Sequence, residues 1–268
     1  MKRKLSGVMI TKNAEGTIGQ SLKSLEGLAD EIIIVDDHST DRTTEIARKF
    51  KAKIYDHQET DYGKQKQYAI EKTSGDWILI LDSDEIVSEG LREEIYTTLN
   101  PSASFRASTK HVTHDAYLIS FQNHFFGKQL KHGGEDYKKL IFFKRDSVKI
   151  DPALVHEKFE SKSGNIGVLK NKMLHYSYRS LPQMFAKFTD YGIREARQKH
   201  LKGEKSSLVK VFLYPPHMFW ARFIKDKGYR DGFFRIPLDL GFAYIEFLTY
   251  VFMLCLELRL CPRSWVKS

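Results

Sequence analysis

The feature that most constrains the fold is the alternation of strand-like and helix-like segments over residues 1–100. Short apolar runs, such as the one at residues 32–35, alternate with longer segments whose apolar residues recur at helical spacing. Parallel strands that are buried on both faces need crossover helices between them. The pattern therefore predicts an α/β fold, with a mostly parallel, Rossmann-like sheet flanked by helices. The expected strands are residues 6–11, 31–37, 52–57 and 76–82, and the expected helices are residues 13–28, 38–50, 62–75 and 88–99.

The rhythm changes after residue 101. Residues 116–130 and 137–145 have alternating or aromatic content, which predicts strands that extend the sheet in a mixed direction. Residues 180–203 have Phe185, Phe188 and Tyr191 on one side of a predicted helix. No internal repeat or low-complexity linker separates these parts.

The charge of the chain is unevenly distributed. Its formal net charge is +9, and from residue 170 onward 18 Lys and Arg face 8 Asp and Glu, whereas the first 169 residues hold 25 and 26. A basic excess of this kind suits nucleic acid, an anionic membrane surface or a phosphorylated substrate. Two cysteines, Cys255 and Cys261, make no disulfide framework and favour a reducing compartment. The apolar run near the N-terminus is too short for a signal peptide and predicts a first strand.

Acidic residues follow two of the predicted strands. Asp82, Asp84 and Glu85 come directly after a buried apolar run, and Asp36 and Asp37 end an earlier one. Ligands of open parallel sheets bind beyond the carboxyl ends of the strands. Strand alternation would put Asp82 and Asp84 on one face, where they could hold a divalent cation and a nucleotide diphosphate. The simpler alternative is an Asp-rich turn or the cap of the next helix.

Three stretches together resemble the family 2 glycosyltransferases, which have the GT-A fold: SGVMITKNAEGTIGQSLKSL, EIIIVDDHSTDRT and GDWILILDSDE. More narrowly, the chain resembles the bacterial glucosyltransferases of lipopolysaccharide core assembly, in which a third acid ends the Asp-x-Asp strand and later VHE and HYSY stretches recur. The resemblance is strong over residues 5–100, moderate over residues 135–200 and weak over the last 60. It implies a GT-A domain at residues 1–200, with a nucleotide-binding half at 1–100 and an acceptor-binding half at 101–200.

The resemblance also implies roles for particular residues. Asp84 would bind the divalent metal, Mg²⁺ or Mn²⁺, and Asp82 would contact the metal or the ribose. A second metal ligand or diphosphate contact could come from His175, for which a buried structural role is the simpler interpretation. The residues that would line the nucleotide-sugar site are Thr11, Asn13, Glu15, Asp36, Asp37, Lys64, Lys66 and Gln67. Helix capping by Ser39 and Asp41, and a solvated helical face for the lysines, are the structural alternatives.

An inverting transferase needs a general base that takes the proton of the acceptor hydroxyl. The VHE match favours Glu157, with His156 beside it. Glu135 and Asp136 are the competing candidates, because a Glu-Asp pair resembles the general family pattern. An ordinary ion pair or loop carboxylate is the alternative for each.

The C-terminal region, residues 201–268, interleaves aromatic and basic residues and is expected to be helical and membrane-associating. Residues 242–260 are largely apolar but carry charges, which favours an interfacial helix over a spanning one. The resemblance implies transfer of a hexose, glucose first, from a UDP-sugar to a lipid-linked glycan on the inner face of the cytoplasmic membrane. The alternative is a nucleotidyl-type α/β enzyme or a nucleic-acid-binding protein, but the sequence has no P-loop and no nucleic-acid module, so no nucleic-acid partner is expected.

Overall fold

The computed structural model describes residues 3–59, 61–100, 114–151 and 158–260. They form two compact units. The first unit is drawn from Met1–Gln122, Tyr137–Pro152 and Glu157–His175, and the second from Asn123–Asp136 and Tyr176–Ser268. The two units interleave along the chain, whereas the sequence led us to expect boundaries at residues 100 and 200.

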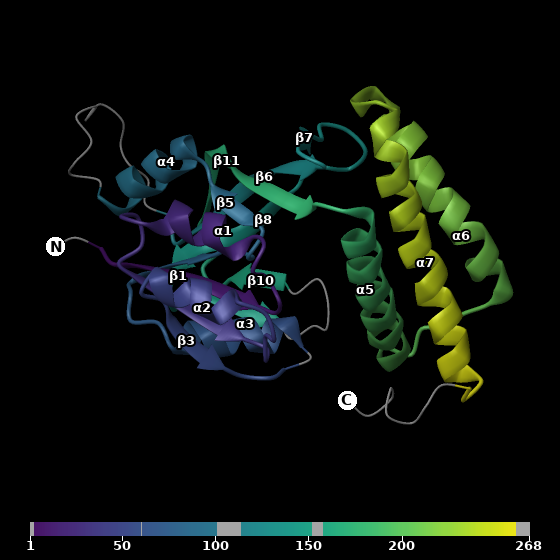
Figure 1. Cartoon of the computed structure of the whole chain (residues 1–268), viewed down its shortest axis with the longest axis horizontal. Helices are drawn as coiled ribbons and strands as arrows, with labels where there is room; N and C mark the ends of the chain where they lie inside the picture. Colours follow the sequence, from purple (N-terminus) through teal and green to yellow (C-terminus); the bar gives the residue numbers. More distant parts are fainter. Residues whose placement is uncertain (1–2, 60, 101–113, 152–157, 261–268) are drawn as a thin grey trace. The chain divides into compact units, whose positions relative to one another are not determined.

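The sheet of the first unit begins with four parallel strands, as predicted, and their order is β3-β2-β1-β4. Helices connect them in the expected succession (Figure 1). The strands are β1 (Leu5–Thr11), β2 (Glu31–Asp36), β3 (Lys53–Asp56) and β4 (Trp77–Ile80), and the helices are α1 (Ile18–Leu25), α2 (Thr43–Lys49), α3 (Tyr62–Glu71) and α4 (Glu89–Leu99).

Beyond β4 the sheet becomes mixed, as expected, and continues in the order β8-β6-β11-β5. The predicted strands are present as β6 (Ala116–Phe125) and β8 (Lys138–Lys144), with β8 antiparallel to both β4 and β6. The sequence analysis missed β5 (Glu85–Val87) and β11 (Ile166–Tyr178), which pair antiparallel. It missed β5 because three residues carry no period, and β11 because its exposed positions mix the apolar Ile166 and Val168 with polar residues. Shorter strands are β7 (Lys128–Gln129), which pairs with β6, and the antiparallel pair β9 (Val148–Asp151) and β10 (Lys158–Ser161).

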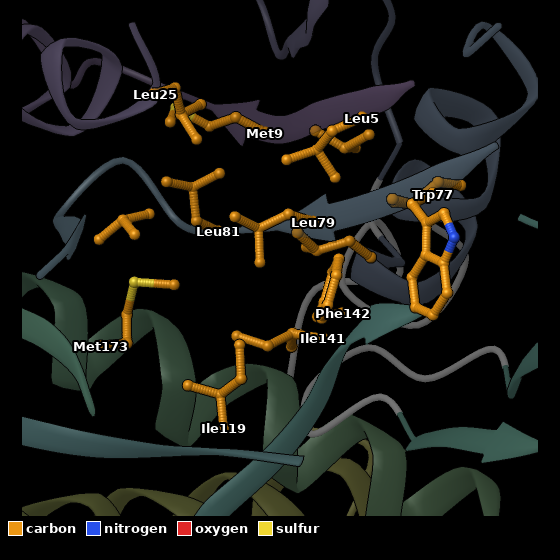
Figure 2. Packing of buried hydrophobic residues seen from close by; sticks show 14 of the residues in the cluster. Leu5, Met9, Leu25, Trp77, Leu79, Leu81, Ile119, Ile141, Phe142 and Met173 are labelled. Atoms are coloured by element: carbon orange, nitrogen blue, oxygen red, sulfur yellow. The ribbon is translucent and has the colours of Figure 1, made fainter. Parts of the chain in front are cut away.

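One continuous apolar core stabilises the first unit. Figure 2 shows Leu5 and Met9 of β1 gathered with Leu79 of β4, Ile119 of β6 and Ile141 of β8. All five are buried. This core holds the carboxyl ends of the parallel strands together at one edge of the sheet, where the acidic residues lie.

Local sequence signals explain several boundaries. Ser88 caps α4 as predicted, because its side chain accepts a hydrogen bond from the backbone N–H of Leu91. Gly75 was expected to stop the preceding helix, but α3 already ends at Glu71. A Cβ at Gly75 would lie 2.5 Å from the Ser6 hydroxyl oxygen, so glycine is needed there for close approach to β1.

The second unit is helical. It contains α5 (Leu181–Leu201), α6 (Leu208–Trp220) and α7 (Ile236–Glu257), and α7 packs against both other helices (Figure 1). A π-helical turn η2 (Ala221–Lys225) and two 3₁₀ turns, η3 (Gly228–Asp231) and η4 (Phe233–Arg235), connect α6 to α7. In the part of the chain that the structure describes, Phe233–Glu257 is the one helix long and apolar enough to cross a membrane, and a third of its apolar window is buried.

Glu31 ties together the amino ends of the parallel strands. Its Oε1 accepts hydrogen bonds from the Ser6 hydroxyl at 2.7 Å and from the backbone and hydroxyl of Ser74, and its Oε2 pairs with Lys53 Nζ at 2.9 Å. Burial alone would raise the pKa of Glu31, but the hydrogen bonds from Lys53, Ser74 and Ser6 outweigh it and lower the pKa to about 2. The carboxylate therefore stabilises the folded state in its charged form.

We predict that Glu31→Gln lowers the free energy of unfolding at neutral pH by about 1–3 kcal/mol, the usual effect of leaving buried donors poorly paired. Since the pKa is lowered on folding, the stabilisation is complete above the ordinary value of 4.5 and is lost as the pH falls towards 2. Urea unfolding at pH 7 and at pH 3 should therefore give a smaller difference between variant and wild type at the lower pH. Glu45→Gln, on the exposed face of α2, is the control and should change little; equal effects of the two substitutions at pH 7 would contradict the role of Glu31.

Candidate active site

The acids after β4 lie in a tight turn rather than in a strand. Since β4 ends at Ile80 and β5 begins at Glu85, the strand-alternation argument for Asp82 and Asp84 was wrong. Glu85 closes the turn: its Oε2 accepts a hydrogen bond from the Asp82 N–H at 2.9 Å, and its own N–H donates to the Asp82 carbonyl at 3.0 Å. The third acid of the motif therefore shapes the backbone that presents the other two.

Each of the three acids lies near a cationic or titratable group from a different element. Lys66 Nζ of α3 is 3.4 Å from Asp82 Oδ1, and Lys139 Nζ of β8 is 3.6 Å from Glu85 Oε1. His175 Nε2 of β11 is 3.5 Å from Asp84 Oδ1. The antiparallel register of β11 with β5 places His175 directly opposite Glu85.

The electrostatics of the turn follow from this arrangement. Burial would raise the pKa of Asp82, but the charges of Lys66 and Lys139 outweigh it and lower the pKa. Burial, with the charge of Asp82, raises the pKa of Glu85. Burial would lower the pKa of Lys139, but Glu85 and Asp82 raise it instead. The Asp82 carboxylate is therefore favoured in its charged form, with Lys66 Nζ beside it and Lys139 Nζ beside the neighbouring Glu85.

The predicted nucleoside residues lie at the carboxyl ends of β1 and β2. Asp36 accepts three hydrogen bonds within the protein. Its Oδ1 accepts from the Thr11 and Ser39 hydroxyls, and its Oδ2 accepts from the Ser39 N–H. Asp37 differs, because Oδ2 pairs with Lys12 Nζ at 2.8 Å while Oδ1 is buried with no hydrogen-bond partner among the residues described. A buried acceptor without a donor is costly.

Asn13 and Glu15 join the two loops that follow β1 and β2. The Asn13 side-chain oxygen accepts a hydrogen bond from the Thr40 N–H at 2.8 Å, and Glu15 Oε2 accepts one from the Arg42 N–H at 3.1 Å. The N-cap residue of α2 is Arg42 rather than Asp41. The Asp41 carboxylate nevertheless accepts a hydrogen bond from the Thr43 N–H in the first turn, which is close to the expected capping role. Thr11, Asn13 and Glu15 thus shape this edge of the sheet through contacts within the protein.

Two hollows lie on the first unit. A cleft of about 630 Å³ opens beside the ends of β2 and β3. It is lined by Asp36, His38, Ser39, Thr40, Thr44, Arg48, Ala52, Ile54 and Asp56. A pocket of about 240 Å³ on α3 is lined in part by Lys64 and Gln67, both exposed, so α3 brings only Lys66 of the three predicted residues to the acidic turn.

The candidate bases fall into different settings. Glu157 and His156 lie outside the described residues. Glu135 belongs to a buried ion cluster of the second unit, where Oε1 accepts from Arg222 and from Arg235 at 2.6 and 2.9 Å. Its Oε2 accepts from the Asn123 amide at 2.8 Å, so both oxygens already have donors. The neighbouring Asp136 is exposed.

The sequence analysis missed Lys139 and gave His175 mainly a structural role. His175 is largely buried and its Nδ1 lies 3.5 Å from the Tyr137 hydroxyl. No local pattern marks Lys139, because its position depends on the pairing of β8 with β4. The HYSY stretch was the only signal for His175.

The donor atoms at the turn fit a divalent cation that takes part of its coordination shell from the protein and the rest from a substrate. Asp84 offers a carboxylate oxygen and His175 an imidazole nitrogen. The described residues contain no group of three or more His, Cys, Asp or Glu suited to holding a metal ion. Magnesium and similar ions in phosphate sites are commonly held by one or two protein ligands, with phosphate oxygens and water completing the shell. The acids and lysines lie together at the end of a parallel sheet, where open α/β folds bind their ligands.

The comparisons identify the family. A model described as "Glycosyl transferase family 2" matches residues 6–143. The chain therefore belongs to glycosyl transferase family 2, it is an enzyme of the glycosyltransferase class, and its mixed, mostly parallel sheet is the GT-A fold that the sequence led us to expect. This membership places it outside the nucleotidyl-type and nucleic-acid-binding alternatives.

Relatives with similar sequences cover almost the whole chain. An uncharacterized glycosyltransferase of Rickettsia bellii (strain RML369-C) is 29% identical over 274 residues, covering 98% of this chain and 90% of the relative. The lipopolysaccharide core biosynthesis glycosyltransferase LpsC of Rhizobium meliloti (strain 1021) is 27% identical over 255 residues, covering 92% and 88%. Among solved structures, S. aureus TarS 1-349 aligns with a TM-score of 0.48 at 15% identity, covering 96% of this chain and 92% of that one.

Proposed function

We propose that the protein is an inverting hexosyltransferase that moves a hexose, glucose first, from a UDP-sugar to the lipopolysaccharide core or another lipid-linked cell-envelope glycan. The observation that carries the proposal is the turn after β4, where Asp84 and His175 lie 3.5 Å apart and Lys66 and Lys139 flank the acids. The acceptor class is supported by the similarity over most of the chain to a glycosyltransferase of lipopolysaccharide core biosynthesis.

The donor end of the site is assigned to the edge formed by β1 and β2. The buried Asp37 Oδ1 would accept a hydrogen bond from the N–H of the uracil. The 630 Å³ cleft, which is lined by the adjacent residues Asp36 and His38, is within the size range of small-molecule sites. Asp82 would contact the ribose or the metal. Lys64 and Gln67 stay assigned to the donor side by resemblance, at the separate α3 pocket.

Asp84 and His175 would hold Mg²⁺ or Mn²⁺, which when bound neutralises the diphosphate as it leaves. The chain itself brings Lys66 and Lys139 to the acids, and the positive charge of lysines there would stabilise the same developing charge. A carboxylate on the acceptor side removes the proton of the attacking hydroxyl, and attack opposite the diphosphate inverts the anomeric carbon.

We assign the base to Glu157, with Asp136 as the competing residue. Glu135 is a poor candidate because both of its oxygens already accept hydrogen bonds. We further propose that the enzyme works as a peripheral protein on the inner face of the cytoplasmic membrane, where a lipid-linked acceptor is accessible. The basic excess after residue 170 supports attraction to anionic lipid.

We predict that Asp84→Ala reduces sugar transfer by more than about 100-fold. The reason is that the divalent cation that would offset the negative charge of the leaving diphosphate loses its carboxylate ligand. Transfer from UDP-glucose would be measured with Mn²⁺ and with Mg²⁺, and circular dichroism would check the fold. Ser83→Ala, in the same turn, serves as the control and should keep its activity. Wild-type turnover in Asp84→Ala would reject the metal assignment.

We predict that Asp37→Ala weakens UDP binding by about 10-fold, the effect of one hydrogen bond to a charged group, without loss of thermal stability. Asp36→Ala should weaken binding too, but with a lower melting temperature, since Asp36 accepts three hydrogen bonds within the loop. Calorimetric titration with UDP measures the first effect and thermal unfolding the second. Unchanged UDP affinity in both variants would move the nucleoside pocket elsewhere, and Glu45→Ala controls for loss of a surface carboxylate.

We predict that Glu157→Gln still binds UDP and metal but transfers the sugar about 10²–10⁴-fold more slowly, as expected for a lost general base. Asp136→Asn should cost much less. The opposite ranking would assign the base to Asp136. In either case NMR of the product should show a β-linkage from an α-linked donor, and retained configuration would reject the single-displacement mechanism.

A further inference from the structure

The helical unit carries an apolar surface that its own packing leaves uncovered. Although α6 packs against α7, Val211 is the only buried residue in the helix. Six large apolar residues along α6 and η2 are between 47% and 67% exposed. We call them the α6 stripe: Leu208, Val209, Phe212, Leu213, Trp220 and Ile224.

The members of the α6 stripe share one helical face. Leu208, Phe212, Trp220 and Ile224 are separated by multiples of four residues, and the exposed Pro216 fills the missing position of that row. Residues four apart are neighbours on a helix surface. Because η2 continues the helix beyond α6, the row runs without interruption from one end of the segment to the other.

The charged residues in the segment that carries the α6 stripe are all basic, and one of them, Arg222, is paired with Glu135 and Asp239. Residues 206–225 contain no Asp or Glu, and Lys210, Arg222 and Lys225 are the charged residues within them. The nearest acids in sequence, Glu204 and Asp226, stand just outside the two ends. Further basic and aromatic residues follow directly, and these are Lys227, Tyr229, Arg230 and Phe233, of which Phe233 is 82% exposed.

We propose that the α6 stripe is the surface that enters the interfacial layer of an anionic lipid bilayer, with Lys225, Lys227 and Arg230 at the headgroups. This inference rests on the peripheral membrane location proposed above and names the surface responsible. Apolar and aromatic residues bordered by Lys and Arg suit the boundary between headgroups and acyl chains. A second copy of the chain fits less well, because two stripes face to face would bring like charges together.

The packing of α7 argues against its being the lipid-contacting helix, although its length suffices to span a bilayer. Asp239 of α7 is fully buried and pairs with Arg235 Nε at 2.9 Å and Arg222 Nε at 3.1 Å. A Cβ added at Gly241 would lie 2.4 Å from Phe188 of α5, so the two helices are in close contact. Moving α7 into lipid would expose this ion cluster to hydrocarbon, at a large cost. The interfacial role that the sequence suggested for residues 242–260 is better filled by α6.

The test is co-sedimentation of the full-length protein with vesicles of phosphatidylcholine, with and without phosphatidylglycerol, at low and high salt. Wild type should bind the anionic vesicles, and the double variant Phe212→Glu/Leu213→Glu should bind at least about 10-fold more weakly, because two apolar contacts are lost and two negative charges are added. Val168→Glu is the matched control: Val168 is 51% exposed on β11 of the first unit, and this variant should bind as wild type does.

A second pair of substitutions tests the charge. Lys225→Gln/Lys227→Gln should weaken binding to anionic vesicles and reduce its salt dependence, with little change for neutral vesicles. Circular dichroism and thermal unfolding would confirm that each variant is folded. Hydrolysis of UDP-glucose without acceptor should be the same in all of them, since none of these residues belongs to the active site.

The outcomes separate this inference from the proposed activity. Absence of vesicle binding by wild type, or equal binding by wild type and Phe212→Glu/Leu213→Glu, would overturn it. A dimer in sedimentation velocity that the double variant dissolves would assign the stripe to a second copy and overturn it too. If no UDP-sugar is hydrolysed while the vesicle results hold, the proposed function fails and the lipid surface stands.

Discussion

The structure depends on how three carboxylates are accommodated within four residues at the end of a buried strand. Asp82 and Glu85 are each compensated by a lysine, and Asp84 faces His175, with the three partners supplied by α3, β8 and β11. Like charges this close repel unless cations or donors offset them. The sheet has to bring three elements from distant parts of the sequence to one turn before the turn is stable. The same arrangement brings two lysines to the turn beside the acids.

The Asp and Glu residues discussed above fall into two groups: those whose carboxylate oxygens accept hydrogen bonds within the protein, and those with an oxygen that does not. Asp36 and Glu31 have their oxygens filled by hydrogen bonds within the first unit, and Glu135 has its oxygens filled within the second. These residues maintain the shape of loops and strand ends. Asp37 keeps one buried oxygen without a donor in the described structure, and Asp136 is exposed. A sequence motif does not distinguish the two groups, because adjacent acids of one motif, such as Asp36 and Asp37, belong to different groups.

Local sequence signals predicted the parallel half of the fold well. Apolar runs predicted β1 to β4, helical spacing predicted the intervening helices, and Ser88 predicted the start of α4. The missed strands depend on distant partners: β5 has three residues, and β11 has a mostly exposed first half of mixed apolar and polar residues and pairs with β5. The acidic turn was located correctly, but its geometry was not, since the turn conformation depends on hydrogen bonds between Asp82 and Glu85.

The sequence by itself determined the family, the α/β class and the positions of the acids at strand ends, because these follow from periodicity and from short contiguous motifs. Only the tertiary structure decided which residues surround those acids. Lys139 and His175 reach the turn through antiparallel pairings between strands far apart in the chain, and no local pattern encodes such a register. The same holds for the helical unit: α6 and α7 are both apolar in sequence, but packing buries seven residues of α7 and only Val211 of α6, because burial is a property of neighbours rather than of composition.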